Sequence, residues 1–281
     1  MISIYIILKI LKKKLNQWLD NKIMNLLIGD IGNTITKICL VEQGNLKIKK
    51  VIYLKNINSM DNYSLKKKFK QVIKSKPINK IALFSSVVPK YHSKIKKFLK
   101  RIYGIRLIEI KEKKINKIIK FNIKNKNQVG SDRIANAVGV YKKYKTNCIV
   151  LDFGTATTFD VVTKEGIYNG GIIAPGVNLS MQSLSNSADQ IPIFSIVKQK
   201  KIIGKNTIEA LRSGFYWGYT GLINNIIFRI EKETKKKYKI IFTGGYADLF
   251  KNSIIKSFSV DKNITIKGII EIYKKNKMSL I

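Results

Sequence analysis

Two aspartates stand where an apolar run meets a glycine turn. Asp30 lies in IGDIGNTITK at residues 28–37, and Asp152 lies in VLDFGTATTF at residues 150–159. A carboxylate in this position can hold a hydrated cation, while the N–H groups of the turn face an anion. Either aspartate alone fits an Asx-turn that caps its own backbone. Two copies in matching contexts favour a site for a nucleotide and its metal.

The segments that follow Asp30 predict the elements that position it. Residues 25–32 and 36–44 are apolar runs joined by a short polar turn, which predicts a β-hairpin. A third strand is expected at residues 47–55, a lysine-rich helix around residues 63–75, and a buried strand in KIALFSSVV at residues 80–88.

The hairpin pattern repeats in the second half of the chain. The helical spacing of residues 130–145, GSDRIANAVGVYKKYK, places Asp132 near the N-terminus of a helix. Residues 147–166 then give an apolar run, an acid, a Gly-Thr turn and a second apolar run. Two halves that each open with Asp-x-Gly predict a duplicated domain with a cleft between the copies. We place the boundary near residue 140, between an N-terminal domain at 24–140 and a C-terminal domain at 141–281.

Two glycine pairs lie near the ends of apolar runs. Gly244 and Gly245, in TGGYADL, follow a buried run, and their lack of a Cβ atom lets the backbone approach a phosphate or a flat ligand. Gly170 and Gly171, in NGGIIAPGV, precede Pro175 and Gly176, and this spacing predicts a rigid loop. A glycine pair after a strand is common in ordinary loops, so neither pair alone defines a ligand-binding site.

The net charge of +37 raises the question of nucleic acid. Lysine carries nearly all of it, together with abundant isoleucine and asparagine, all of which have AT-rich codons. Nucleic-acid surfaces use arginine for bidentate contacts and aromatic side chains for stacking, and the lysine runs at residues 66–70 and 235–237 contain no arginine. We therefore attribute the charge to genomic base composition and expect no nucleic-acid partner.

The first 23 residues form an extension that we expect to lie outside the core fold. Their apolar opening is broken by Lys9 and is shorter than the ~20 residues that a membrane span needs. Ile7, Leu11 and Leu15 fall on one helical face, which also fits a helix on a membrane surface. Met24 stands directly before the first predicted strand. This favours an extension, and we expect no membrane partner.

The cysteines and the histidine limit the available chemistry. Cys39 and Cys148 lie far apart in apolar runs, which favours buried thiols in a reducing compartment. His92 is the only histidine and is expected at the surface start of a helix. A histidine metal cluster is therefore excluded, and a Ser-His-Asp triad would depend on this one residue.

Six motifs in order resemble the type III pantothenate kinases, which belong to the superfamily of actin, sugar kinases and heat-shock-chaperone ATPases. The motifs are DIGNTITK, GSDRIANAV, DFGTATTFDVV, GGIIAPG, IGKNTIEALRSG and TGGYA, and the likeness covers about residues 24 to 280. The resemblance implies an α/β fold of two ribonuclease-H-like domains with mixed sheets flanked by helices and an ATP cleft between them. It also implies transfer of the ATP γ-phosphate to pantothenate, the first step of coenzyme A synthesis, by a cytoplasmic homodimer that uses Mg²⁺ and K⁺ or NH₄⁺.

The resemblance also assigns roles to residues. It implies that Asp132 is the catalytic proton acceptor and that Asp152 is the ligand of the monovalent cation. ATP binding is expected at Asp30, Ile31, Gly32, Asn33, Thr34, Ile35, Thr36, Lys37 and Thr155. Pantothenate binding is expected at Gly130, Ser131, Asp132, Arg133 and Thr207. Arg133 is also a natural partner for a substrate carboxylate on chemical grounds, and its alternative role is an ion pair at the surface or at a dimer interface.

The chain departs from the family pattern at two positions. Ser131 stands where the family most often has alanine, and Ile123 stands where it commonly has an aromatic that touches substrate. Two other functions stay open. One is a non-catalytic regulatory or nucleic-acid-associated protein with the same fold, although such a protein has no use for Asp30, Asp132 and Asp152 together. The other is a sugar or acetate kinase of the superfamily.

Overall fold

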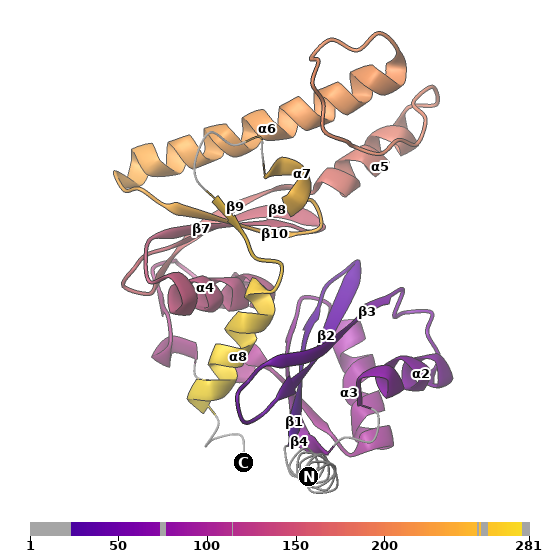
Figure 1. Cartoon of the computed structure of the whole chain (residues 1–281), viewed down its shortest axis with the longest axis vertical. Helices are drawn as coiled ribbons and strands as arrows, with labels where there is room; N and C mark the ends of the chain where they lie inside the picture. The colour runs from indigo at the N-terminus through magenta and orange to yellow at the C-terminus, as the bar shows by residue number, and fades with distance from the viewer. Residues whose placement is uncertain (1–23, 74–76, 114, 252, 254–257, 277–281) are drawn as a thin grey trace, which may run out of the picture. The chain divides into compact units, whose positions relative to one another are not determined.

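The computed structural model describes residues 24–73, 77–113, 115–251, 253 and 258–276. The contacts divide the described chain into two compact units, residues 24–113 together with Asn276, and residues 115–275 (Figure 1). The expected extension at residues 1–23 lies outside the described residues. Within them, no helix is both long and apolar enough to cross a membrane.

The first unit is a mixed sheet covered by two helices. Its strands are β1 (Asn25–Ile31), β2 (Ile35–Glu42), β3 (Ile48–Lys55), β4 (Ile78–Ser86) and β5 (Arg106–Glu109), in the order β3-β2-β1-β4-β5. β1, β2 and β3 pair antiparallel, whereas β4 lies parallel to β1 and β5 parallel to β4. The helices are α2 (Asn62–Ile73) and α3 (Pro89–Tyr103). Phe69, Phe98 and Leu99 of these helices pack with Leu27 and Phe84 of the sheet.

The second unit contains a similar sheet with more helices. Its strands are β6 (Lys120–Phe121), β7 (Cys148–Phe153), β8 (Ala156–Val162), β9 (Ile167–Pro175), β10 (Lys239–Gly244) and β11 (Phe258–Val260). Their order is β11-β10-β7-β8-β9-β6. The helices are α4 (Ser131–Tyr144), α5 (Val177–Ser187), α6 (Thr207–Thr234), α7 (Ala247–Phe250) and α8 (Ile264–Asn276). The described residues also form short 3₁₀ turns, Ile110–Glu112 in the first unit and Ile115–Lys117 and Lys126–Gln128 in the second.

The two sheets repeat one topology. In each, a three-stranded antiparallel meander is followed by a strand that pairs parallel with its first strand and by another that pairs parallel with that one. The strands β7, β8, β9, β10 and β11 thus correspond to β1, β2, β3, β4 and β5. The short strand β6 is an addition at the β9 edge of the second sheet. The fold class expected from the sequence, α/β with two mixed sheets flanked by helices, is confirmed.

The second sheet has an apolar face and a face that carries acids. Figure 1 shows α6 and α7 over one face, and α4 and α8 over the other. Ile149, Leu151 and Phe153 of β7 point into the apolar core beneath α6 and α7. Because successive side chains of a strand alternate between faces, Asp152 belongs to the face that α4 and α8 cover.

Glycines allow α4 and α8 to cross closely. A Cβ atom on Gly268 of α8 would lie 1.8 Å from the carbonyl oxygen of Ala135 in α4, and one on Gly139 would lie 2.5 Å from that of Ile264. Contacts this short exclude any side chain at these two positions without movement of a helix. The backbone of α4, which carries Asp132 and Arg133, is therefore held against α8.

Two local expectations differ from the structure. The predicted boundary near residue 140 falls inside α4, which packs against β7 and β8 and so belongs to the second unit. Gly170 and Gly171, expected in a rigid loop, lie in strand β9, where Gly171 pairs with β8 and Gly170 falls at an irregularity of the ladder. The glycine pair predicted a loop, but the pairing of β9 with β8, in which Gly171 lies opposite Asp160, decides the conformation there.

Candidate active site

The first hairpin holds Asp30 at the end of β1, in the first unit. Ser85, on the neighbouring strand β4, donates a hydrogen bond to Oδ1 of Asp30. Across the hairpin Asp30 is paired with Lys37, whose Nζ lies 5.8 Å from the centre of the Tyr53 ring. The carboxylate is half-buried. It is thus fixed at the end of a strand beside the turn, as the sequence predicted.

The residues around that turn divide by exposure. Asn33, Thr34 and Ile35 are exposed, and the N–H of Gly32 donates to the carbonyl of Ile35 over 3.2 Å to close the turn. The side chain of Ile31 is in the apolar core. Thr36 is fully buried. Ile31 and Thr36 are therefore fully covered in this structure, backbone included.

The second hairpin repeats this geometry around Asp152 and Thr155. The N–H of Gly154 donates to the carbonyl of Ala156 over 3.1 Å, and Thr155 is exposed at the tip. Gly176, the N-cap of α5, lies so close that a Cβ atom on it would be 2.1 Å from the carbonyl oxygen of Thr155. The N-terminus of a helix carries partial positive charge and unpaired N–H groups. The turn and the start of α5 thus form a setting suited to phosphate.

The GSDR segment forms the start of α4. Gly130 is the N-cap, Ser131 is buried, and Asp132 lies in the first turn, where the helix dipole favours a negative charge. The backbone N–H of Arg133 donates to Oδ1 of Asp132 over 2.8 Å. The side chain of Asp132 is therefore tied to its own helical turn, next to Arg133.

Asp152 is held by a relay from α4 and α8. Nδ2 of Asn136 donates to Oδ2 of Asp152 over 3.0 Å, and the hydroxyl of Thr265 donates to Oδ1 of Asn136 over 2.7 Å. Burial raises the pKa of Asp152 to about 6, the hydrogen bond from Asn136 opposes this, and the negative charge of Asp132 adds to it. Asp132 and Asp152 therefore lie close enough to influence each other's ionisation.

Gly244 provides a second close approach to Asp152. Its φ is +85°, and a Cβ atom on it would lie 2.7 Å from Oδ1 of Asp152. The glycine pair of TGGYA thus comes up against the carboxylate at the end of β7. The approach that the sequence predicts for this glycine pair, to a phosphate or a flat ligand, stays a prediction.

Arg133 forms a buried ion pair with an acid that the sequence analysis did not single out. Its Nε donates to Oδ1 of Asp160 on β8 over 2.7 Å, and the hydroxyl of Tyr168 on β9 donates to the same oxygen over 2.8 Å. Burial raises the pKa of Asp160 to about 7 and Arg133 opposes that rise, while Asp160 raises the pKa of Arg133 against the effect of burial. The Arg133 side chain is 14% exposed and that of Asp160 is 0% exposed.

Thr207 lies on a separate element from this cluster. It is the first residue of α6 and is exposed, after the N-cap Asn206, whose side chain accepts from the N–H of Glu209 over 2.9 Å. The structure therefore brings together Asp132, Arg133 and Asp152 from the predicted site of the second unit and places Thr207 at the start of another helix.

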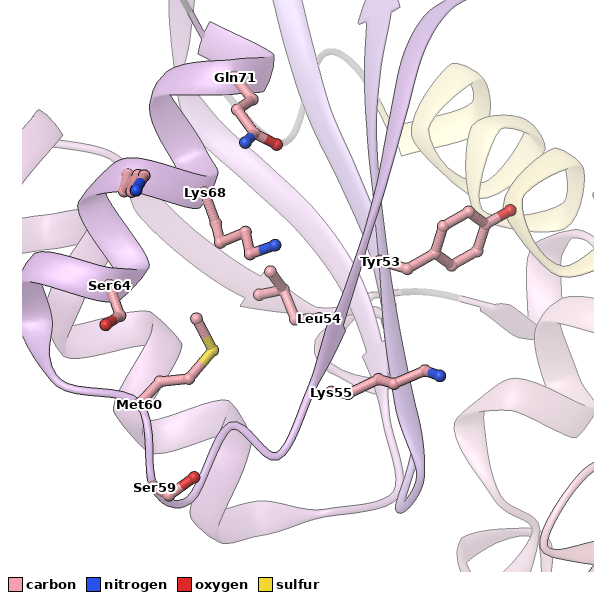
Figure 2. Close-up of a pocket in the computed structure, with 9 residues that line it drawn as sticks. Tyr53, Leu54, Lys55, Ser59, Met60, Ser64, Lys68 and Gln71 are labelled. Carbon is pink, nitrogen blue, oxygen red and sulfur yellow. The ribbon is translucent and has the colours of Figure 1, made fainter.

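A groove of about 610 Å³ lies in the first unit between β3 and α2 (Figure 2). Tyr53 and Lys55 point away from α2, whereas Leu54 and Lys68 lie between the strand and the helix. The charged groups of the groove do not converge. Its lining includes none of the residues that the sequence assigns to ATP or pantothenate.

The acids can be tested against the cations that the resemblance implies. Among the described residues, no group of three or more His, Cys, Asp or Glu side chains could hold a metal ion by itself. Mg²⁺ in phosphoryl-transfer sites keeps several waters and uses one or two carboxylates plus substrate phosphates. Asp30, half-buried beside the first turn, fits that pattern. Burial raises the pKa of Asp152, and the side-chain amide of Asn136 orients its carboxylate. This carboxylate fits a cation, which would stabilise its ionised form.

Comparisons with known proteins agree on one family. The family model of type III pantothenate kinases matches residues 26–229. A type III pantothenate kinase from Pelagibacter ubique is 52% identical over 247 residues, which cover 87% of this chain and 97% of that protein. One from Jannaschia sp. is 40% identical over 195 residues, covering 69% of this chain and 75% of that protein. The chain belongs to the type III pantothenate kinase family.

A solved structure supports the fold. The protein described as a conserved putative Baf family transcriptional activator from Campylobacter jejuni is similar, with a TM-score of 0.59 at 22% sequence identity. The match covers 90% of this chain and 99% of that protein. At this identity the likeness concerns the arrangement of the helices and strands only.

Four contributors to the cluster were missed at the sequence level: Asn136, Asp160, Tyr168 and Thr265. Asp160 offered a signal, because a lone acid in the apolar run TTFDVV is costly to bury without a partner. Asn136 lay within the recognised helix, on the same face as Asp132 at a spacing of four residues. Tyr168 and Thr265 carried no local signal, since their partners come from other elements.

Proposed function

We propose that this chain transfers the γ-phosphate of ATP to the alcohol group of pantothenate, with Asp132 accepting the proton that the alcohol loses. Family membership makes the chain a pantothenate kinase, a transferase. The role of Asp132 is our proposal. The observation that carries it is the first turn of α4, where a carboxylate, an arginine and the charge of Asp152 come together.

Phosphoryl transfer asks the protein mainly to position groups and to neutralise charge. The turn at Thr155 and the N-terminus of α5 offer N–H groups and partial positive charge to the phosphates of ATP. The hairpin Asp30–Lys37 offers the corresponding turn in the first unit. In a loose transition state the alcohol loses its proton late, so a carboxylate such as Asp132 is a sufficient acceptor without a histidine.

Arg133 is proposed to bind the carboxylate of pantothenate. Guanidinium binds carboxylates in a planar, bidentate geometry. With Asp132 beside it on the same helical turn, Arg133 would fix one end of the substrate while its alcohol meets the acid. Gly130 and Ser131 precede both residues, and Thr207 is proposed as a further substrate contact.

Two cations complete the proposal. Mg²⁺ would be bound by Asp30 together with phosphate oxygens of ATP, and it would neutralise charge that develops on the phosphates. K⁺ or NH₄⁺ would be bound by Asp152, whose carboxylate Asn136 and Thr265 hold in place. A cation there would keep Asp152 ionised against the effect of burial.

We also propose a cytoplasmic homodimer. Cys39 and Cys148 are both free and buried, and burial raises the pKa of each thiol to about 12, which fits inert thiols in a reducing compartment. The second unit exposes several large apolar side chains, and we propose that some of them meet the partner copy. They include Ile193, Ile202, Ile203 and Phe228.

The assay is ADP release by the purified chain with ATP, Mg²⁺ and K⁺, in which pantothenate is compared with sugars and acetate. We expect release that depends on pantothenate and not on the other acceptors. Release that depends on a sugar or on acetate would move the chain to another kinase class. No acceptor-dependent release at all would contradict the proposed function.

A further inference from the structure

We propose that Asp160 and Tyr168 are positioning residues that orient Arg133, so that the chain selects acceptors that carry a carboxylate. This inference deepens the proposed function and rests on it. It concerns three side chains from three elements: Arg133 from α4, Asp160 from β8 and Tyr168 from β9.

The contacts fix Arg133 through one nitrogen only. Nε donates to Oδ1 of Asp160 over 2.7 Å, and Tyr168 donates to the same oxygen over 2.8 Å. Within the described part of the chain, the terminal nitrogens of Arg133 make no hydrogen bond. A guanidinium presents five N–H donors in a planar fork. With Nε engaged, the two terminal NH₂ groups are left to bind a carboxylate.

The second sheet accommodates the guanidinium of Arg133 because a glycine, Gly171, stands beside it. Gly171 on β9 is directly opposite Asp160 in the ladder. A Cβ atom on Gly171 would lie 2.7 Å from Nη2 of Arg133 and 2.0 Å from the carbonyl oxygen of Phe159. The guanidinium therefore lies against the backbone of β9, where any other residue would displace it. Asp160 holds the group from one strand and Gly171 makes room for it on the next.

Burial explains why the orientation would be strict. The Asp160 side chain is fully buried, and its Oδ2 has no hydrogen-bond partner among the described residues. The charge of a fully buried carboxylate is stable only while its ion partner, here Arg133, stays beside it. Rotation of Arg133 away from Asp160 would leave that charge uncompensated, so the guanidinium has one strongly favoured position. An arginine held in this way loses little conformational entropy when a ligand binds.

The orientation has a consequence for substrate choice. A site built to pair with a charged group rejects an analogue that lacks it, because the buried donors are then left unsatisfied. The analogue to use is pantothenate with its carboxylate reduced to a primary alcohol. The chain should prefer pantothenate over this alcohol, and that preference should depend on Asp160 although Asp160 need not touch the substrate.

The test compares Asp160→Asn with a matched control. Asp261→Asn removes the charge of another buried aspartate of the same unit, whose carboxylate pairs with Lys143 at 2.5 Å and Lys267 at 2.7 Å. Tyr168→Phe removes one donor to Asp160 and keeps the ring. Binding of pantothenate and of the alcohol analogue is measured by calorimetry for each variant, and KM and kcat are measured beside it.

Asp160→Asn should weaken pantothenate binding by about 10- to 100-fold, the range of one charge-assisted contact. Binding of the alcohol analogue should change by less than about threefold, and KM for ATP should stay near that of the unaltered chain. Tyr168→Phe should shift the preference in the same direction by a smaller factor. Asp261→Asn should leave the preference unchanged.

Several outcomes would overturn the inference. They are an unaltered chain that binds both ligands equally, an Asp160→Asn variant with unchanged preference, and an Asp261→Asn variant that loses preference equally. If Asp160→Asn does not fold, Tyr168→Phe decides, and an unchanged preference in that variant refutes the role. Calorimetry reports on binding without turnover. A chain that prefers the carboxylate, loses that preference in Asp160→Asn and shows no ADP release would therefore refute the proposed function and support the role of Asp160.

Discussion

Substitution of Gly268 by alanine tests the helix crossing that supports the active site. The new Cβ atom would lie 1.8 Å from the carbonyl oxygen of Ala135, whereas ordinary contact begins at 3.4 Å. α8 must therefore move away from α4 by about 1.6 Å, because the opposing atom belongs to a helix backbone and cannot rotate away. That movement is large enough to break the 2.7 Å hydrogen bond from Thr265 to Asn136.

The free energy of unfolding should fall by about 2 kcal/mol. Overpacking costs about 1–3 kcal/mol. The cost for Gly268→Ala should lie near the upper end, because the opposing carbonyl of Ala135 belongs to a helix backbone. Alanine in a helix interior regains about 1 kcal/mol relative to glycine. For a domain of this size the loss corresponds to a decrease in Tm of roughly 4–8 °C. The measurement is thermal unfolding followed by circular dichroism, with kcat at saturating substrates determined beside it.

Gly214→Ala is the control for helix propensity. Gly214 is exposed in α6, and a Cβ atom there would meet nothing within 4 Å. This variant should gain about 0.5–1 kcal/mol and keep full activity. If Gly268→Ala is as stable as Gly214→Ala, then α4 and α8 do not approach as closely as the structure has them and the reasoning fails.

Three other predictions address the cations and the charge. Asp30→Asn should raise the Mg²⁺ concentration needed for half-maximal activity, since it removes charge from the proposed metal site; an unchanged Mg²⁺ requirement would exclude that role. Asp152, whose pKa is raised to about 6, takes up a proton as the pH falls through about 6, so activity should fall there. Added K⁺ should move this fall to lower pH because the cation binds the ionised form, and Asp152→Asn should remove the K⁺ dependence; a pH profile unaffected by K⁺ would contradict the assignment. Binding to duplex DNA should be weak and should vanish at moderate salt, as expected for scattered lysines; salt-resistant, sequence-selective binding would show that the charge has a function.

Local sequence signals were sufficient for the hairpins and their acids. The alternation of apolar residues and the glycine turns around Asp30 and Asp152 are properties of neighbouring residues, so they could be predicted directly. The duplicated topology could be predicted because the hairpin pattern occurs once around Asp30 and again around Asp152. The start of α4 at the GSDR segment was likewise visible, because an acid in the first turn is a helix signal.

Interactions between distant elements could not be predicted in this way. Asp160 meets Arg133 only because α4 crosses β8, and Thr265 reaches Asn136 from 129 residues away. The glycine pair at residues 170–171 was expected in a loop, but strand pairing decided its conformation. The boundary near residue 140 was misplaced relative to the compact units for a related reason, since the packing of α4 and not its sequence assigns it to the second unit.

The most direct test of the central claim is Asp132→Asn, measured in both turnover and binding. The amide has nearly the shape of the carboxylate and can still hydrogen-bond the alcohol of pantothenate, but it cannot accept the proton. Loss of a general base typically costs about 10²–10⁴-fold. We therefore expect kcat to fall by at least about 100-fold while the calorimetric affinity for pantothenate stays nearly unchanged. A variant that keeps near-normal kcat, or that no longer binds pantothenate, would contradict the assignment of Asp132 as the proton acceptor.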